Sequence, residues 1–356
     1  MPETHENITY QSFDFDKFEL FYKFKDKYSL FELSVDWLLA TIKHMGESSS
    51  LICVHCLLQD DKILVAWPLV QHKTGIVFNV QSLTSFYSSV SEPFYDSPKN
   101  QQRYLEILFK EVCSHNQWDK FTLGPLEFIN YSAIEQNQYS KIYSETDNWY
   151  EDDIQSFQQY YDERPSRLKN TIKRREKQLI KKHKHHIKVV TCKKEFDLFF
   201  SCYKSIYEKS WKGEEYSYDF IEQVCLKAIN ENKLRFGLLI VDNKAVAAQI
   251  WFLQGGVASI FKLAYDPQYQ NFSVGSILSM ALSQHVIDVD KVHTIEFGMG
   301  SEPYKKDWMS KCNKRVTLQI FNHKTMIGNV LAFRYIALSK IKDWMLAKIA
   351  KYIVRE

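Results

Sequence analysis

The sequence predicts an α/β (α+β) protein with two lobes, in which mixed, mostly antiparallel sheets are flanked by helices and a C-terminal amphipathic helix follows. Three observations predict this class. The chain has 356 residues, 45% of them hydrophobic, which is enough for two domains of ordinary size. Apolar residues at helical spacing alternate with short runs rich in β-branched and aromatic residues. A polar stretch at positions 130–162 separates two such series.

The first series has the elements of an α/β unit. Apolar spacing around Trp37 predicts a helix, and Leu51–Leu58 and Lys62–Val70 predict two strands joined by a turn at positions 59–61. Gln101–His115 again shows helical spacing, and Lys120–Leu123 predicts a short strand after it. In the polar stretch, 142–144 is the only predicted strand. We therefore place the boundary there, with lobes at residues 1–150 and 151–323 and the C-terminal helix at 324–356.

The segment after the boundary is strongly basic. Arg164–Lys188 contains eleven Lys or Arg residues and one acid, Glu176, and Pro165 is predicted in the first turn of a helix. Because acids are almost absent, salt bridges within the helix do not explain this charge. A solvated helix at the junction, a docking surface for an anionic substrate such as a tRNA or a glycan-precursor phosphate, and a nucleic-acid patch remain alternatives.

The second series predicts the order ααβββαβαβ. Its elements are helices at 194–211 and 218–230, strands at 234–241, 245–253 and 258–265, a helix from near Ser273, a strand at 294–297, a short helix at 304–308 and a strand at 316–321. Apolar residues in 325–352 then describe a long amphipathic helix. It fits either ordinary packing or attachment to an anionic membrane surface.

Composition narrows the class of protein. The 46 basic and 43 acidic residues leave a net charge of only +3, so any polyanion-binding surface must be local. Seven cysteines, an odd number in a large chain, favour a reducing compartment. No apolar run approaches the roughly 18 residues of a membrane span. The expected location is the cytoplasm, with peripheral attachment to the inner membrane as an alternative.

No metal site is expected. Cys53-Val54-His55-Cys56 offers a half-site, but it lies in a strand-like run where positions three apart point to opposite faces, and no second cysteine pair completes it. These cysteines are predicted to be buried as small hydrophobic residues. The histidines at 183, 185 and 186 lack the spaced partners that zinc requires.

The passage from the strand at 258–265 into the following helix predicts an anion site. The strand ends at Ala264-Tyr265-Asp266, and Gln270–Ser276 then brings small residues to the start of the helix. Small residues let backbone N–H groups approach a ligand, Ser273 can cap the helix, and the helix N-terminus carries about half a positive charge. A pyrophosphate could bind there without a lysine.

These residues resemble the GNAT superfamily of N-acyltransferases. Gln270–Gly275 looks like the Q-x-x-G-x-G/A acyl-CoA loop of that superfamily, with Ser273 in place of the first glycine. The pieces that resemble the FemAB-like and CelD-like (cellulose and polysaccharide biosynthesis) branch are Ala264-Tyr265-Asp266, Ser273-Val274-Gly275, Glu296-Phe297-Gly298 and Tyr304-Lys305. The resemblance covers Arg164–Phe321, while Phe31–Leu126 is similar to the degenerate first GNAT-like lobe of the same branch.

The resemblance implies an acetyl-CoA or other acyl-CoA co-substrate and no metal. The strand ending at Tyr265 would pair with the pantetheine amides, the strand at 294–297 would diverge from it, and the thioester would lie in the gap. The implied donor-binding residues are Leu263, Ala264, Tyr265, Gln270, Asn271, Phe272, Ser273, Val274, Gly275 and Ser276.

Four residues are candidates for the chemistry. Removing a proton from an amine with a pKa near 10 costs roughly 4 to 5 kcal/mol at pH 7, so a carboxylate base is expected, and Glu296 and Glu302 are the candidates. Solvated surface acids are the alternative for both. Tyr304 could protonate the leaving thiolate, or pack its ring beside Trp308 with its hydroxyl in water. Lys305 could orient the substrate or neutralise charge.

Three functions follow from these features. The first is transfer of an acyl group from CoA to an amine, on a sugar or another cell-envelope or polysaccharide precursor. The second is FemAB-like transfer of an amino acid from aminoacyl-tRNA to a peptidoglycan precursor, with the tRNA on the basic segment. The third is an inactive GNAT-like module that binds nucleic acid or a partner through that segment.

Overall fold

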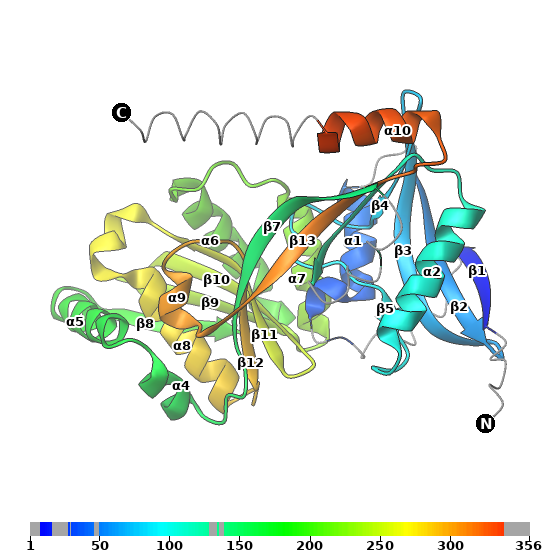
Figure 1. Cartoon of the computed structure of the whole chain (residues 1–356). Coiled ribbons are helices and arrows are strands. Elements are labelled where there is room, and N and C mark those ends of the chain that lie inside the picture. Colours follow the sequence, from blue (N-terminus) through cyan, green and yellow to red (C-terminus); the bar gives the residue numbers. More distant parts are fainter. Residues whose placement is uncertain are drawn as a thin grey trace, which may run out of the picture. The chain divides into compact units, whose positions relative to one another are not determined.

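The computed structural model describes residues 8–15, 28, 30–45, 50–127, 134 and 139–337. The chain forms two compact units, and each draws on separate stretches of sequence. Unit 1 comprises Met1–Phe24, Gly46–Glu145 and Lys314–Glu356, and unit 2 comprises Lys25–Met45 and Thr146–Asn313. The division at 150/151 and 323/324 stays a prediction about folding domains. Figure 1 shows the elements of both units along the chain.

Unit 1 is a sheet covered by one long helix. Its strands follow the order β1 (Ile8–Asp14), β2 (Leu51–Gln59), β3 (Lys62–Thr74), β4 (Val77–Ser82), β6 (Lys120–Glu127) and the second part of β13 (Lys311–Phe321), and β5 (Phe94–Tyr95) pairs with β3. Among the strands that the structure describes in unit 1, only β4 and β6 pair in parallel. The helix α2 (Gln101–His115) buries Tyr104, Leu105, Leu108, Phe109 and Val112, so its predicted bounds and apolar face are confirmed.

The predicted hairpin of unit 1 is confirmed. Gln59 pairs with Lys62, and Asp60 and Asp61 take positive φ angles of 50° and 61° between them. Two consecutive left-handed residues make the tight turn that matches the twist of a hairpin. The predicted burial of the two cysteines is also confirmed, since Cys53 is 7% and Cys56 0% exposed. The described residues contain no group of three or more potential metal ligands.

Unit 2 contains the elements predicted between residues 194 and 308 in the predicted order, but the last predicted strand, at 316–321, is part of β13 and lies in unit 1. Its helices are α1 (Val35–Met45), α4 (Phe157–Glu163), α5 (Ser166–Lys182), α6 (Phe196–Lys209), α7 (Tyr218–Asn230), α8 (Val274–Asp288) and α9 (Lys305–Trp308). Its strands lie in the order β7 (Tyr139–Glu151, from Thr146), β12 (Thr294–Met299), β11 (Val257–Tyr265), β10 (Lys244–Gln254), β9 (Leu234–Val241) and β8 (His185–Val190). β11 and β12 are parallel, and the other neighbours are antiparallel.

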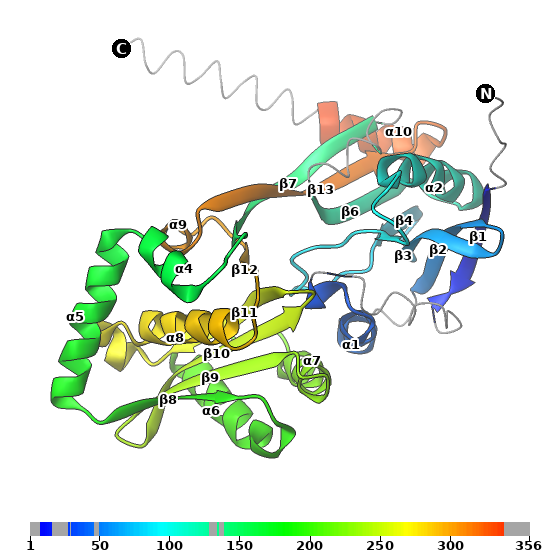
Figure 2. The same ribbon diagram turned by 90° about the horizontal axis from the view of Figure 1, so that it is seen from below.

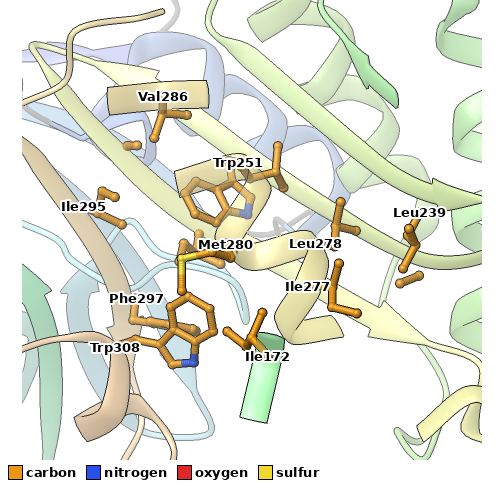
Figure 3. Packing of buried hydrophobic residues seen from close by; sticks show 14 of the residues in the cluster. Ile172, Leu239, Trp251, Ile277, Leu278, Met280, Val286, Ile295, Phe297 and Trp308 are labelled. Carbon is orange, nitrogen blue, oxygen red and sulfur yellow. The ribbon is translucent and has the colours of Figure 1, made fainter. Parts of the chain in front are cut away.

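Helices cover both faces of the unit 2 sheet. In Figure 2, α8 with α4 and α5 lies on one side of β9, β10 and β11, and α6 with α7 lies on the other. The core on the α8 side includes Trp251, Leu278 and Phe297. Figure 3 shows Ile172 of α5 and Trp308 of α9 reaching the same cluster. The start of α8 is thus held against the sheet by large buried side chains.

Several local predictions are corrected. The strand expected at 142–144 is the middle of β7, which runs from Tyr139 to Glu151, because alternation in a polar strand gives little apolar signal. Pro165 is the N-cap of α5 (φ −56°, ψ 138°) and not a residue of its first turn. β8 follows the basic helix at a position where no strand was predicted.

The C-terminal helix is seen in part. α10 spans Met326–Ala332, with the Thr325 side chain accepting a hydrogen bond from the Gly328 amide, and a π-helical turn continues to Ala337. The rest of the helix predicted up to residue 352 lies outside the described residues. Within the described part of the chain, no helix has the length and apolarity needed to cross a membrane.

Candidate functional site

The site lies where β11 and β12 separate. The two strands pair only at Val257↔Thr294, Ala258↔Ile295 and Ser259↔Glu296, although β11 continues to Tyr265. The predicted divergence of the two strands is therefore present. Beyond Ser259, β12 does not cover the edge of β11. An exposed strand edge offers backbone donors and acceptors to an extended ligand.

A β-bulge changes which side chains of β11 face each side of the sheet. On β10, the neighbours Ile250 and Trp251 pair with Lys262 and Ile260, so Phe261 is the extra residue. The extra residue reverses the alternation of the strand after it. Ile260 joins the core under α8, while Lys262 reaches Glu215 in the α6–α7 connection.

The start of α8 is a turn without a side-chain cap. Ser273 has a left-handed conformation (φ 53°, ψ 42°), and its side chain caps no helix amide, so the predicted capping role is wrong. Its carbonyl accepts from the Ile277 amide at 3.0 Å. Among the described residues, no acceptor bonds the amides of Val274, Gly275 and Ser276. These N–H groups and the helix dipole favour a negatively charged ligand.

Gly275 allows the strand end and the helix start to approach closely. A Cβ atom at Gly275 would lie 3.2 Å from Cδ1 of Tyr265. The Gly275 carbonyl accepts from Gln249 Nε2 at 3.0 Å, and the same nitrogen donates to Ser279 Oγ at 2.8 Å. Gln249 Oε1 in turn accepts from Trp251 Nε1 at 2.9 Å. This buried network fixes the helix start against β10, and sequence reasoning did not find it.

The ten residues predicted to bind the donor lie along one continuous path. Leu263, Ala264 and Tyr265 end β11, and the 3₁₀ turn Pro267–Phe272 contains Gln270, Asn271 and Phe272. Asp266 begins this turn by accepting from the Gln268 amide at 3.0 Å and pairing with Lys244 at 2.9 Å. Ser273, Val274, Gly275 and Ser276 then lead into α8. Their role as a donor site stays a prediction.

Three of the four predicted chemical residues come together after β12. Lys305 Nζ lies 3.1 Å from Glu302 Oε2 and donates to the Met299 carbonyl at 2.7 Å. The Lys305 side chain is 5% exposed and that of Glu302 is 56% exposed. The Tyr304 ring packs edge-on against Phe297, with centroids 5.6 Å apart. Glu296 is buried on β12 at its last pair with β11.

The environment shifts the pKa values of this group. Burial raises the pKa of Tyr304 to about 12, with a smaller contribution from the Glu302 charge. Burial lowers the pKa of Lys305, and Glu302 opposes part of that effect. Burial alone would raise the pKa of Glu302, but hydrogen bonds from its own amide and from Lys305 hold it below the ordinary value. At neutral pH, Tyr304 is a proton donor and Glu302 a carboxylate.

A second charged group near β11 was missed by sequence reasoning. Lys262 Nζ lies 2.8 Å from Glu215 Oε1, and the side chains are 10% and 1% exposed. Glu215 also accepts from the Tyr203 hydroxyl at 2.9 Å. Lys212 lies beside them in the same connection, and burial, more than the charge of Lys262, lowers its pKa to about 8. Lys262 is distant in sequence from Lys212 and Glu215, and the residues form no motif, so only the fold brings them together.

The basic helix α5 lies beside the predicted donor loop, which we define as Gln270–Ser276. Lys182 Nζ lies 5.8 Å from the centroid of the Phe272 ring, and the ring of His183 meets the same ring edge-on at 5.4 Å. The apolar face of α5, with Leu168, Ile172 and Leu179, is buried. The exposed face carries Lys173, Arg174, Lys177 and Lys181. This face is positive and solvated, as the composition predicts.

Comparison with known proteins finds a similarity in the second part of the chain. Residues 166–306 match the family model described as an acetyltransferase (GNAT) domain. This stretch of the chain is therefore similar to GNAT-type acetyltransferase domains. The match spans less than half of the chain but includes α5, the three antiparallel strands, the start of α8 and the Glu302–Lys305 group. A search of the curated proteins found no match. The narrower CelD-like resemblance stays a prediction.

Solved structures extend the fold comparison to most of the chain. FemX is 9% identical, with a TM-score of 0.59, and the alignment covers 92% of this chain and 99% of FemX. A conserved protein of unknown function from Bacteroides thetaiotaomicron VPI-5482 is 9% identical, with a TM-score of 0.57 and coverage of 88% and 100%. The C-terminal domain of a putative lysylphosphatidylglycerol synthetase from Agrobacterium fabrum is 9% identical, with a TM-score of 0.51 and coverage of 82% and 90%.

These likenesses, at 9% identity, concern the fold alone. They confirm the predicted fold class of mixed sheets flanked by helices, and the match to the family model supports the GNAT-like arrangement over residues 166–306. The alignments to FemX and to the Bacteroides protein extend well beyond residues 166–306, so the shared fold includes elements of both units.

Proposed function

We propose that the chain is an N-acyltransferase that moves an acyl group from acetyl-CoA or another acyl-CoA to an amine acceptor on a sugar or another cell-envelope or polysaccharide precursor. One observation carries the proposal: the unbonded amides of Val274, Gly275 and Ser276 stand at the start of α8, next to the end of β11 that β12 does not cover. A pyrophosphate fits the amides, and an extended pantetheine fits the strand edge.

The fold supports a proton path for amide formation. Attack of the amine on the thioester carbonyl forms the C–N bond, and collapse of the tetrahedral intermediate breaks the C–S bond. The amine must lose a proton and the thiolate must gain one. In this proposal Glu302, a carboxylate at neutral pH, accepts the amine proton directly or through water, with Glu296 as the buried alternative. Tyr304 donates to the thiolate, and Lys305 holds Glu302 in place.

Calorimetric titration with CoA tests the donor. The unaltered protein should bind CoA, and Gly275→Val should bind it at least tenfold more weakly, because its Cβ meets the Tyr265 ring at 3.2 Å and its branches obstruct the amides. Gln284→Val, at an exposed position of the same helix, is the matched control and should bind like the unaltered chain. Absence of CoA binding, or equal affinity for Gly275→Val, contradicts the proposal.

A second donor is favoured by the basic face of α5. Lys173, Arg174, Lys177 and Lys181 form a positive surface on the same unit as the candidate site, and an aminoacyl-tRNA donor, as in FemAB-like transferases, would need such a surface. Filter binding of a charged tRNA at about 150 mM salt distinguishes the two donors. Tight tRNA binding that Lys177→Glu abolishes favours this donor, and no binding removes it.

An inactive binding module is separated by turnover. In that case Tyr304→Phe and the double variant Glu296→Gln/Glu302→Gln would leave binding of nucleic acid or a partner unchanged, whereas an enzyme would lose product formation while still binding CoA. The acceptor itself is best found by screening amino-sugar acceptors against acyl-CoA donors and measuring release of the CoA thiol.

A further inference from the structure

The strand bulge and the α6–α7 connection together build a charged group on the side of the sheet opposite α8. Phe261 is the extra residue of the bulge, and after it Lys262 turns to the side covered by α6. There it meets Glu215, whose side chain is 1% exposed. Burying a lysine and a glutamate is expensive unless they pair closely and are hydrogen-bonded. The 2.8 Å ion pair and the Tyr203 hydroxyl at 2.9 Å satisfy that condition.

Lys212 stands next to this pair without a carboxylate of its own. Lys212 Nζ and Lys262 Nζ each lie 5.8 Å from the centroid of the Tyr207 ring, so the two ammonium groups share one aromatic neighbour. Among the described residues, no acid lies within ion-pair distance of Lys212 and no acceptor bonds its ammonium. Its side chain is half-buried.

The charges around Lys212 do not compensate it. Those that shift its pKa are Lys262 and Lys305, which lower it, and Glu215 and Glu302, which raise it. These four charges cancel in pairs, and Glu215 and Glu302 already contact Lys262 and Lys305. The positive charge of Lys212 is therefore uncompensated in a partly buried environment. An anion that bound here would form the ion pair with the Lys212 ammonium that none of the described residues provides.

The position of Lys212 links the donor loop to the chemical residues. Its neighbour Trp211 stacks on Tyr265, with ring centroids 4.5 Å apart, and Tyr265 packs on Gly275 at the start of α8. In the other direction, Lys212 feels the charges of Glu302 and Lys305. A group bound at Lys212 would therefore lie near the end of β11 at Tyr265 and within the range of the charges of Glu302 and Lys305.

We propose that Lys212 binds an anionic group of the acceptor, a phosphate or a carboxylate carried near the amine that is acylated. The proposal rests on the proposed acyltransferase function and adds the chemical class of the acceptor to it. Glu215 and Lys262 act as positioning residues, because their mutual pair leaves Lys212 as the free cation. An amine acceptor without a phosphate or carboxylate would leave the charge of Lys212 uncompensated and should be a poorer acceptor.

The experiment measures the titration of Lys212 in the full chain. Protein labelled with ¹³C at the lysine Cε atoms gives one signal for each lysine, and Lys212→Met assigns the signal of Lys212. Titration midpoints are compared in sodium chloride, sodium phosphate and sodium acetate at equal ionic strength, each with and without saturating CoA. Lys204, which lies 4.0 Å from Glu222, serves as the internal reference in the same spectra.

With CoA present, phosphate or acetate should raise the Lys212 midpoint by at least half a pH unit and leave that of Lys204 unchanged. A rise in phosphate alone identifies a phosphate-bearing acceptor, and a rise in acetate alone a carboxylate-bearing one. No shift with either anion overturns the proposal. A shift produced by CoA alone, to which neither anion adds, also overturns it, because Lys212 would then bind the donor.

The two proposals fail in different ways. If CoA does not bind but the anions still raise the Lys212 midpoint, the acyl-CoA function fails and the anion site stands. If CoA binds and the midpoint does not move, the donor proposal stands and the anionic acceptor is excluded.

Discussion

Tyr304 is the residue whose chemistry depends most clearly on its surroundings. Its ring packs on Phe297 and its pKa is raised to about 12, so the hydroxyl keeps its proton throughout the physiological range. Tyr304→Phe keeps the ring contact and removes the hydroxyl group together with its proton. We expect turnover to fall by roughly 10² to 10⁴ fold, the usual contribution of a general acid, with unchanged CoA affinity. Steady-state rates and CoA titration check this.

The control for Tyr304 is Tyr143→Phe, at an exposed position of unit 1, which should leave turnover as it was. Unchanged turnover in Tyr304→Phe would remove the tyrosine from the proposed chemistry and return it to the packing role that the sequence left open.

Lys212 should weaken the fold at neutral pH. Its pKa is about 8 in the folded chain and about 10.4 in an unfolded one, so between these values the unfolded chain binds more protons and stability rises with pH. Lys212→Met removes a partly buried ammonium charge whose desolvation lowers the free energy of unfolding. We expect it to raise the free energy of unfolding at pH 7, with an advantage that shrinks as the pH rises from 8 to 10.

Urea unfolding of Lys212→Met and of the exposed control Lys184→Met, at pH 7 and pH 10, measures this difference. Because all other groups titrate alike in the variants, the comparison isolates Lys212. A lower stability of Lys212→Met at pH 7 would show that the ammonium is satisfied in the folded chain and would argue against an anion site.

The helix α5 is the element that joins the basic surface to the donor loop. Ile172 is 6% exposed and reaches the core beside Trp308, whereas Ile180 on the same helix is 59% exposed. Ile172→Ala should therefore cost about 2 to 5 kcal/mol of stability, and Ile180→Ala less than about 0.5. Denaturant melts of the two variants provide the test. Similar losses would mean that α5 does not pack as described.

Elements with a strong apolar pattern were predictable, and the others were not. β9 matches its predicted bounds, and so does α7, because each combines a long periodic run with turn residues at both ends. β1 and β8 were missed because they are short and partly polar. The full length of β7 was missed because that strand is also polar. The left-handed Ser273 could not be read from a motif that suggested a capping side chain.

The candidate site was predictable only where it follows the chain. Gln270–Ser276 and Glu302–Lys305 are local stretches, so small residues before a helix could indicate a loop, and the resemblance to the GNAT superfamily could point to the chemical group. Glu215 and Lys262 meet only because a bulge at Phe261 reverses the strand, and a one-residue change of register is not visible in the sequence. Within the described part of the chain, Lys212 lacks a carboxylate partner because Glu215 pairs with Lys262, so its uncompensated charge could not be predicted from the sequence either.

At the scale of the whole molecule, unit 2 depends on a segment far away in sequence. Trp37 of α1 packs edge-on against Phe220, with ring centroids 5.0 Å apart, and against Phe261 at 5.4 Å. A fragment with residues 151–323 lacks α1 and all of β7 except Glu151, and it would expose the rings of Phe220 and Phe261 that Trp37 contacts. We expect it to melt at a lower temperature than the full chain and to bind a hydrophobic dye.

The same fragment tests the domain division read from the sequence. If residues 151–323 melt like the full chain and bind no dye, they fold as an independent domain, and α1 adds nothing to their core. Trp37→Ala in the full chain is the companion variant, and it should cost about 3 to 5 kcal/mol if α1 completes unit 2.

The central claim is that the amides at the start of α8 bind the pyrophosphate of an acyl-CoA. Backbone amide NMR of ¹⁵N-labelled protein, titrated with CoA, tests it most directly. The account predicts saturable downfield shifts of the Val274, Gly275 and Ser276 amides, as expected for N–H groups that gain an anionic acceptor, and no shift along α2. Saturation with CoA that leaves these three amides unmoved would contradict the account.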